Sequence, residues 1–290
     1  MSLSGLCILL LIHGAVFSGA PLERPVTGVG LGEIIDSKNP AFPTGSVVIG
    51  LGFSWEEYSK VSAANLKTFS VIPIPRNPKI ALTNYLNVLG LNGLTAFAAI
   101  ETLVKFKKDQ VVYISSAAGP VGSFLAILAK REGVQVIGSA GSDEKVQYLL
   151  NNIGVDTAFN YKTLDAQAEL KKHASDGLDI HFDLVAGESL DVTLEHMKPH
   201  AQVVAVGNVG ESNAKVPYVN KNLGLIIKRS LTVNGLSAFH HLDKYPLLWE
   251  KIMPFIERGE IPAQRETVIK GSEYLDGKYH DKISVEVATL

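Results

Sequence analysis

A tight turn of small residues at positions 117–122 is the part of the chain whose residue types and spacing could bind a phosphate. It reads AAGPVG and fills the places of the pattern GxGxxG, with alanine at the first glycine. Gly119 lets the backbone approach a pyrophosphate, and Gly122 lets the following helix pack closely on the preceding strand. Pro120 suits the first turn of a helix, where its missing N–H costs nothing. We therefore predict that Gly119-Pro120-Val121-Gly122 binds the pyrophosphate of a dinucleotide.

A plain strand-to-helix turn would also place two glycines in this way, so the flanking residues matter. The β-branched run VVYIS at 111–115 precedes the turn, and Phe124, Leu125 and Leu128 follow at helical spacing. A strand, a turn and a helix in that order form the context in which the pattern binds dinucleotides. Dinucleotide binding is therefore favoured over a purely structural turn.

The end of the next expected strand, residues 134–138, indicates which dinucleotide is bound. An NAD site carries an Asp or Glu about 20 residues past the glycine pattern, where it bonds the ribose 2′-hydroxyl. Here the strand runs into GSAGS at 138–142, with no carboxylate at its tip. These small residues leave room for a 2′-phosphate, Ser142 can donate a hydrogen bond to it, and Lys145 supplies positive charge. A lysine alone is more often a solvated helix residue, but with the missing acid it favours NADP(H) over NAD(H).

The elements that must position these residues alternate along the chain from about residue 110. Runs typical of strands, such as QVIGSA and IHFDLVAG, alternate with helix-spaced runs such as VGSFLAILAKREG. This alternation predicts an α/β fold with a doubly wound parallel sheet. A β-rich segment precedes it at 26–60, with a turn at Thr44-Gly45. The tail from residue 236 contains an amphipathic helix and ends in an alternating strand, KISVEVATL.

Composition excludes several classes of partner. A net charge of -2 and a pI near 6.5 leave no basic excess to neutralise a nucleic-acid backbone, so small ligands are the expected partners. The single cysteine, Cys7, can form no internal disulfide and no CxxC pair, and the eight histidines are scattered, so no metal site is expected.

The N-terminus contains an apolar run, LCILLLIHGAVF at 6–17, that is too short for a membrane span. Ser18-Gly19-Ala20 after it resembles a cleavage site, which favours a signal peptide, but no Lys or Arg precedes the run. A buried N-terminal strand and a mis-assigned start are the alternatives. A chain with one cysteine fits a reducing compartment, so we expect a cytoplasmic protein.

Several segments from about residue 25 onward resemble the zinc-independent medium-chain dehydrogenase/reductases. The likeness is to the NADP-dependent alkenal double-bond reductases, which include leukotriene B4 12-hydroxydehydrogenase (prostaglandin reductase). Its carriers are PVTGVGLGEII, SWEEYS, LGLNGLTAFAAIE, SSAAGPVGS, VIGSAGSDEKVQYL, FNYKT and IERGEI. SAGSDEK together with FNYKT is specific to this branch, whereas the glycine turn is shared by many families.

The resemblance implies a Rossmann doubly wound parallel sheet joined to a GroES-like catalytic domain. The expected segments are an apolar leader at 1–20, a partial GroES-like domain at 21–85, an NADP-binding Rossmann domain at 86–235 and a return to the catalytic domain at 236–290. Family members are commonly dimers through the Rossmann sheet, so a homodimer is expected.

The resemblance also implies where the cofactor lies. Lys145 and Tyr161 of FNYKT would contact the adenosine 2′-phosphate. Gly207, Asn208 and Val209 would line the nicotinamide, and Leu236, Ser237 and Ala238 would flank it on the other side. No residue of this chain is assigned a catalytic role.

The chain departs from the family at its start and at three cofactor positions. Family members carry further residues ahead of PVTGVG, so we expect an N-terminally truncated catalytic domain. Leu184 and Tyr279 stand where the family has asparagine and are expected to weaken cofactor binding. Ser212 stands where the family has a tyrosine, and an unactivated hydroxyl is a poor proton donor at neutral pH.

These observations together predict an NADPH-dependent reductase of the C=C bond of α,β-unsaturated aldehydes and ketones, with hydride transfer to the β-carbon. Such a transfer needs the two reacting carbons held within about 3–3.5 Å and does not require a side-chain acid, because water can protonate the enolate. An NADPH-dependent quinone or ketone reductase is one alternative. A catalytically impaired NADPH-binding protein is another.

Overall fold

The computed structural model describes residues 5–13, 27–54, 58–62, 72–212, 216–261, 267–270 and 283–286. The chain forms two compact units. The first comprises Met1–Leu91, Trp249–Arg258 and Ala263–Leu290, and the second comprises Asn92–Leu248 and Gly259–Pro262. The four segment boundaries expected from the sequence stay a prediction.

The described strands of the first unit form one sheet with the order β12-β13-β1-β2-β3-β5, in which β4 also pairs with β1. Their bounds are β1 (Gly5–His13), β2 (Thr27–Asp36), β3 (Val47–Ser54), β4 (Tyr58–Ser62), β5 (Ile72–Pro73), β12 (Thr267–Lys270) and β13 (Ile283–Glu286). Part of the apolar N-terminal run is thus a strand, since β1 pairs antiparallel with β2, β4 and β13. The expected strand at the end of the tail is also confirmed as β13.

The predicted turn at Thr44-Gly45 connects β2 to β3 as an antiparallel hairpin. Gly45 has a φ of +84°, which L residues with a side chain rarely adopt, and its N–H donates to the Ile34 carbonyl at 2.7 Å. Apolar side chains of the two strands, including Leu31 and Ile49, are fully buried. Helix α1 (Leu82–Leu86) belongs to this unit, and α9 (Tyr245–Glu257) begins in the second unit and belongs to the first from Trp249 onward.

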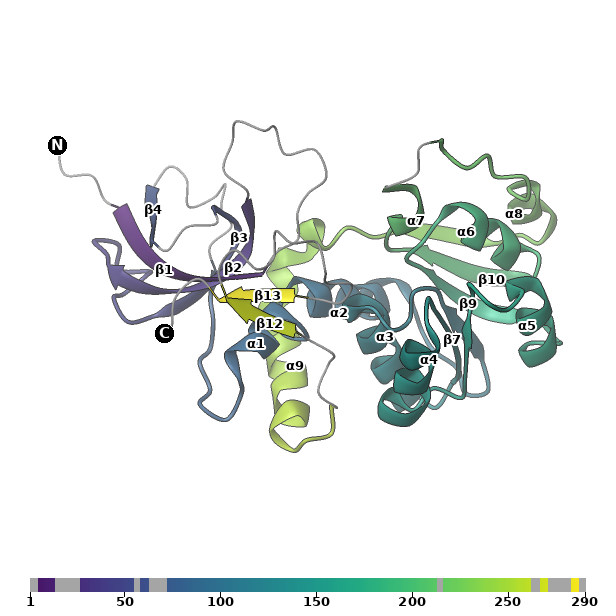
Figure 1. Cartoon of the computed structure of the whole chain (residues 1–290), viewed down its shortest axis with the longest axis horizontal. Coiled ribbons are helices and arrows are strands. Elements are labelled where there is room, and N and C mark those ends of the chain that lie inside the picture. The colour runs from purple at the N-terminus through teal and green to yellow at the C-terminus, as the bar shows by residue number, and fades with distance from the viewer. Residues whose placement is uncertain are drawn as a thin grey trace. The chain divides into compact units, whose positions relative to one another are not determined.

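In the second unit the described strands form a six-stranded parallel sheet with the order β11-β10-β9-β6-β7-β8. Their bounds are β6 (Val111–Ile114), β7 (Gln135–Ala140), β8 (Thr157–Asn160), β9 (Leu178–Asp183), β10 (Met197–Ala205) and β11 (Thr232–Gly235). Figure 1 shows the strands side by side in the teal and green part of the ribbon. The doubly wound parallel sheet predicted from the alternation of elements is confirmed.

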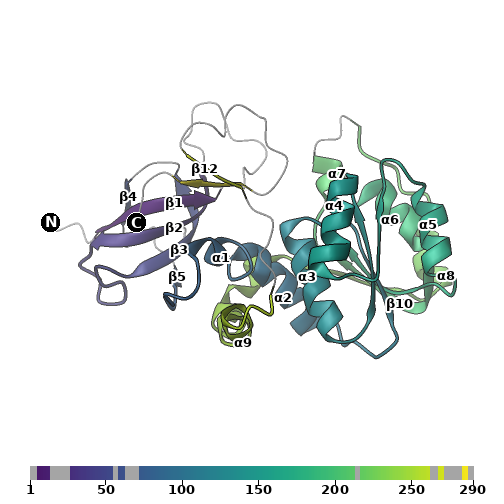
Figure 2. The same ribbon diagram turned by 60° about the horizontal axis from the view of Figure 1, so that its bottom comes forward.

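Helices cover both faces of this sheet. The helices are α2 (Leu91–Leu103), α3 (Pro120–Arg131), α4 (Asp143–Tyr148), α5 (Ala166–His173), α6 (Gly187–Leu194), α7 (Val209–Ser212) and α8 (Gly224–Lys228). A π-helical turn, η1 (Leu149–Ile153), continues α4, and a 3₁₀ segment, η2 (Ala238–Lys244), follows β11. Figure 2 shows α3 and α4 on one face and α5, α6 and α8 on the other.

The chain changes direction in this sheet at β6. It runs from β6 outward to β7 and β8, and then crosses back to β9, which pairs with the other side of β6. The loops after β6 and β9 therefore diverge at the carboxyl edge, and doubly wound sheets bind their ligands at such a switch point. A hydrophobic core cluster of this unit includes Tyr113, Phe159 and, from α5, Leu170.

Candidate functional site

The loops that leave β6 and β9 are joined at the switch point by a buried polar network. The Leu184 N–H donates to the Ser115 hydroxyl oxygen at 2.9 Å, and that hydroxyl lies 3.4 Å from Asp183 Oδ1. Asp183 Oδ1 also accepts from the N–H groups of Val185 at 3.1 Å and Ala186 at 2.9 Å. Ser115 is fully buried and Asp183 is 1% exposed, so this network holds both loop origins without competition from water.

The Asp183 carboxyl is ionised in this setting. Burial acts to raise its pKa, but the neighbouring His181 ring and the N–H groups of Ala186 and Val185 act to lower it, and the pKa lies below its ordinary value of 3.8. His181 is itself fully buried, and its Nε2 is 3.7 Å from Asp183 Oδ1. Its ring stacks on Tyr113 with centroids 4.9 Å apart. The network therefore extends into the core below the switch point.

The small-residue turn takes the geometry that its glycines suggest. Gly119 precedes α3 in an extended conformation, and Pro120 occupies the first turn of that helix. A Cβ on Gly122 would lie 2.6 Å from the Ser116 carbonyl oxygen and 2.8 Å from the Ala117 Cα. The start of α3 thus packs closely on the turn that follows β6, and Gly119 to Val121 are only half-buried at the carboxyl edge. The binding of a pyrophosphate at this turn stays a prediction.

The end of β7 lies under the beginning of the loop after β8. A Cβ on Gly141 would lie 3.1 Å from the Tyr161 hydroxyl oxygen and 3.4 Å from Lys162 Cε. Ser142 is the N-cap of α4, and its hydroxyl oxygen accepts the N–H of Lys145 at 3.4 Å. The hydroxyl hydrogen of Ser142 is not used in that bond and remains available to a ligand. Ser142, Lys145 and Tyr161, the residues predicted to bind the 2′-phosphate, thus follow the ends of two neighbouring strands. Lys162 lies at the same place and was not predicted from the sequence.

The loop after β10 is bonded to the loop after β9. The N–H groups of Val206 and Gly207 donate to the Asp183 carbonyl at 2.7 and 3.1 Å, and the Val209 N–H donates to the Leu184 carbonyl at 3.3 Å. A Cβ on Gly207 would lie 3.0 Å from that same Leu184 oxygen. The predicted residues Gly207, Asn208 and Val209 therefore stand beside the switch-point network.

The second predicted nicotinamide segment begins where β11 ends. The Leu236 N–H donates to the Ala205 carbonyl of β10 at 2.9 Å, Ser237 precedes η2, and Ala238 is buried. These residues follow β11 at the carboxyl edge of the sheet, and their place beside a nicotinamide stays a prediction. Of Ser212 only the backbone is described, at the end of α7, and Tyr279 lies outside the described residues.

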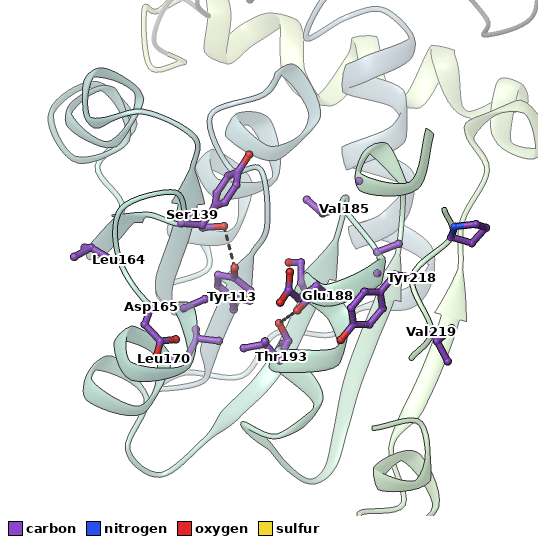
Figure 3. Close-up of a pocket in the computed structure, with 18 of the residues that line it drawn as sticks. Tyr113, Ser139, Leu164, Asp165, Leu170, Val185, Glu188, Thr193, Tyr218 and Val219 are labelled. Carbon is purple, nitrogen blue, oxygen red and sulfur yellow. Dashed lines mark hydrogen bonds between the residues drawn. The ribbon is translucent and has the colours of Figure 1, made fainter. Parts of the chain in front are cut away.

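A pocket of about 730 Å³ opens between α5, α6 and the carboxyl ends of the strands (Figure 3). Its walls are largely apolar and include Leu164, Leu170 and Val185. At its floor the Tyr113 hydroxyl and the Ser139 hydroxyl are hydrogen-bonded at 2.9 Å. Burial raises the pKa of Tyr113 to about 12, although the bond to Ser139 opposes that rise, so the phenol is neutral at physiological pH. The pocket also includes Tyr161, which connects it to the end of β7.

Comparison with known proteins identifies the family. A family model described as zinc-binding dehydrogenase matches residues 120–257. The chain is 34% identical to the 2-alkenal reductase (NADP(+)-dependent) of Nicotiana tabacum over 251 residues, which are 86% of this chain and 71% of that protein. The chain belongs to the NADP-dependent alkenal reductase branch of the medium-chain dehydrogenase/reductases. The resemblance predicted from SAGSDEK and FNYKT is therefore confirmed.

A second relative supports the same family, and a solved structure shows the same fold. The chain is 32% identical to the (+)-pulegone reductase of Mentha piperita over 237 residues, which are 81% of this chain and 68% of that protein. The fold is similar to the crystal structure of CurA from Vibrio vulnificus in complex with NADPH. The superposition includes 100% of this chain and 91% of that chain, with a TM-score of 0.83 and 20% sequence identity. At that identity the likeness shows the shared fold of the family.

The part of the chain that the structure describes contains neither a group of side chains suited to a metal ion nor a helix suited to span a membrane. No three or more His, Cys, Asp or Glu side chains come together in a group that could hold a metal ion. No described helix has the length and apolar character needed to cross a membrane.

Proposed function

We propose that this protein is an NADPH-dependent oxidoreductase that reduces the C=C bond of α,β-unsaturated aldehydes or ketones. The observation that carries the proposal is the end of β7, where Gly141 bears no carboxylate and the Tyr161 hydroxyl and Lys162 lie over it. A site for NAD would place an acid there to bind the ribose 2′-hydroxyl. Family membership supports a reductase, and the printed names of two relatives, a 2-alkenal reductase and a pulegone reductase, support enals and enones as acceptors.

The residues present fit a bound dinucleotide phosphate. Gly119 to Val121 are half-buried at the carboxyl edge beside the switch point, so the turn is not closed off from solvent. A Cβ on Gly122 or Gly207 would lie 2.6 or 3.0 Å from a backbone oxygen, so both positions suit glycine. We place the pyrophosphate at Gly119-Pro120-Val121-Gly122, the 2′-phosphate at Ser142, Lys145 and Tyr161, and the nicotinamide between Gly207-Asn208-Val209 and Leu236-Ser237-Ala238. The pocket beside Tyr161 would take the adenosine end, because its 730 Å³ falls within the range of about 300–1,000 Å³ of small-molecule sites.

When bound, NADPH supplies the hydride, and the residues of this chain bind and orient the reactants. No described side chain is assigned as the proton donor, so water protonates the enolate in this proposal.

Titration with NADPH and NADH, followed by mixing with different acceptors, tests the proposal. We expect NADPH to bind more tightly than NADH and to be oxidised when a 2-alkenal is added. If NADPH were oxidised only when a 1,4-quinone or a saturated ketone is added, that compound class would replace enals and enones as the proposed acceptors. Binding without oxidation by any acceptor would favour a non-catalytic NADPH-binding protein, and the absence of NADPH binding would overturn the proposal.

We further propose that the protein is a cytoplasmic homodimer that pairs through β11. This strand is at the edge of the parallel sheet, and edge strands present unpaired N–H and C=O groups to another chain. Val233 on β11 is 46% exposed and Ile227 on α8 is 83% exposed, which gives the edge an apolar surface. Val233→Lys is expected to convert a dimer into a monomer in sedimentation, whereas the exposed Val209→Lys is expected to leave the mass unchanged.

A further inference from the structure

We propose that Lys162 is a specificity-determining residue that contacts the 2′-phosphate of the cofactor. This inference rests on the proposed NADPH site and extends it, because the residues assigned from the sequence were Ser142, Lys145 and Tyr161. Its starting point is the geometry of three neighbouring chain segments, namely the end of β7, the first turn of α4 and the loop after β8.

The side chain of Asn160 fixes the backbone of Lys162 relative to α4. Asn160 is 6% exposed, and its Oδ1 accepts the Lys162 N–H at 3.1 Å. Its Nδ2 donates to Asp143 Oδ1, in the first turn of α4, at 2.7 Å. One buried carboxamide thus connects the loop that carries Tyr161 and Lys162 to the helix that carries Lys145. The loop and the first turn of α4 are thereby held next to each other.

Gly141 lies beneath the Tyr161 and Lys162 side chains. Its missing side chain leaves a space that the Tyr161 hydroxyl and Lys162 Cε border at 3.1 and 3.4 Å from the position of a Cβ. The Tyr161 N–H donates to the Ala140 carbonyl at 3.2 Å, so the hydroxyl and the lysine stem converge over the same strand end. Any side chain at position 141 would compete with both for this space.

The charge around Lys162 suits an anion. Among the described residues no carboxylate is within ion-pair distance of its ammonium group, and the nearby Asp143 carboxylate accepts a hydrogen bond from the Asn160 amide. The Tyr161 side chain is 50% exposed, so its hydroxyl can reach a ligand from solvent. A compact ammonium beside a phenolic and an alcoholic hydroxyl is a donor set for a phosphate dianion. The ribose 2′-hydroxyl of NADH offers that ammonium no charge.

Binding measurements on the whole protein test the role of Lys162 without relying on turnover. The probes are NADPH, NADH and adenosine 2′,5′-bisphosphate, with dissociation constants from calorimetry for the unaltered protein, Lys162→Gln and Lys162→Arg. We expect Lys162→Gln to weaken NADPH and the bisphosphate about tenfold and to leave NADH unchanged. Lys162→Arg retains the charge and is expected to recover most of the affinity. Lys107→Gln, an exposed lysine in the turn before β6 at the opposite edge of the sheet, is the matched control.

Gly141→Ala provides a second test at the same place. The atoms that its Cβ would meet are the ends of two side chains that can move, so the protein is expected to fold normally. Because Tyr161 and Lys162 would be displaced, the Gly141→Ala variant is expected to bind NADPH several-fold more weakly. Its affinity for NADH should change little.

The outcomes separate this inference from the proposed function. If the unaltered protein prefers NADPH and Lys162→Gln leaves that preference unchanged, the inference about Lys162 is wrong and the proposed function stands. Equal losses for NADPH and NADH in Lys162→Gln would also overturn it, because they would indicate a structural role. If the unaltered protein binds neither NADPH nor the bisphosphate, both proposals fail.

Discussion

The two ends of the proposed cofactor site are built in opposite ways. At the switch point Ser115 and Asp183 are buried, and they hold the loops after β6 and β9 by hydrogen bonds to backbone N–H groups. At the end of β7 the groups that lie over Gly141 belong to Tyr161 and Lys162, which are exposed side chains. In the proposed site, the buried end would set the shape that any dinucleotide needs. The exposed end would discriminate between NADPH and NADH.

Removing Asp183 is expected to have the largest effect. Asp183→Ala leaves the N–H groups of Val185 and Ala186 without their acceptor in a buried site, which costs about 3 kcal/mol of unfolding free energy. Urea unfolding measures this loss, and NADPH and NADH should weaken together. Asp183→Asn keeps an acceptor oxygen and is expected to lose less. If Asp183→Ala changed the affinity for NADPH alone, the different roles given to the two ends of the site would be wrong.

Ser115→Ala is expected to cause the second-largest loss of unfolding free energy. The change removes the hydroxyl that accepts the buried Leu184 N–H, at a cost of about 1–2 kcal/mol. The loops after β6 and β9 would separate slightly, so both cofactors should again bind more weakly by similar factors. Thr102→Val is a suitable control, because the Thr102 hydroxyl donates only to the Ala98 carbonyl of its own helix. An unaltered unfolding midpoint in Ser115→Ala would contradict the role given to this hydroxyl.

Lys145→Ala tests the exposed end with a smaller expected change in stability. Lys145 is half-buried in the first turn of α4, next to Ser142, and we expect NADPH to bind about tenfold more weakly without its charge. Binding of NADH should be unaffected. Titration at low and high salt adds a check, because a phosphate contact weakens as salt rises. Equal losses for the two cofactors would remove the basis for calling this an NADP site.

The smallest expected effect is the acid sensitivity that Asp183 adds to folding. Its pKa is lowered in the folded protein, so its contribution to stability is fully present above the unfolded value, near 3.8, and is lost as the pH falls through the lower folded value. Unfolding midpoints measured between pH 6 and pH 3 should therefore fall more steeply for the unaltered protein than for Asp183→Asn. Parallel curves would indicate that the carboxyl is not stabilised in its ionised form.

Local patterns in the sequence account for most of the second unit. The alternation of β-branched runs and helix-spaced runs predicts the parallel sheet, because each element buries one face at its own period. The glycine turn before α3 and the turn at Thr44-Gly45 were also predictable, since both need backbone approaches or angles that favour glycine. In contrast, Ser115, Asp183 and Lys162 were not singled out. A serine or aspartate at a strand end has many ordinary roles, and the FD of IHFDLVAG was the only available hint.

By itself the sequence determined that a turn of small residues follows a buried strand and that no acid stands at the next strand end. Those features are local, because they depend on residues within one strand–turn–helix unit. Only the tertiary structure decided that Ser115 meets Asp183, 68 positions away, and that Tyr161 and Lys162 lie over Gly141. The physical reason is that strand order and register bring distant strand ends to one edge of the sheet. The period of a single strand carries no information about its neighbour.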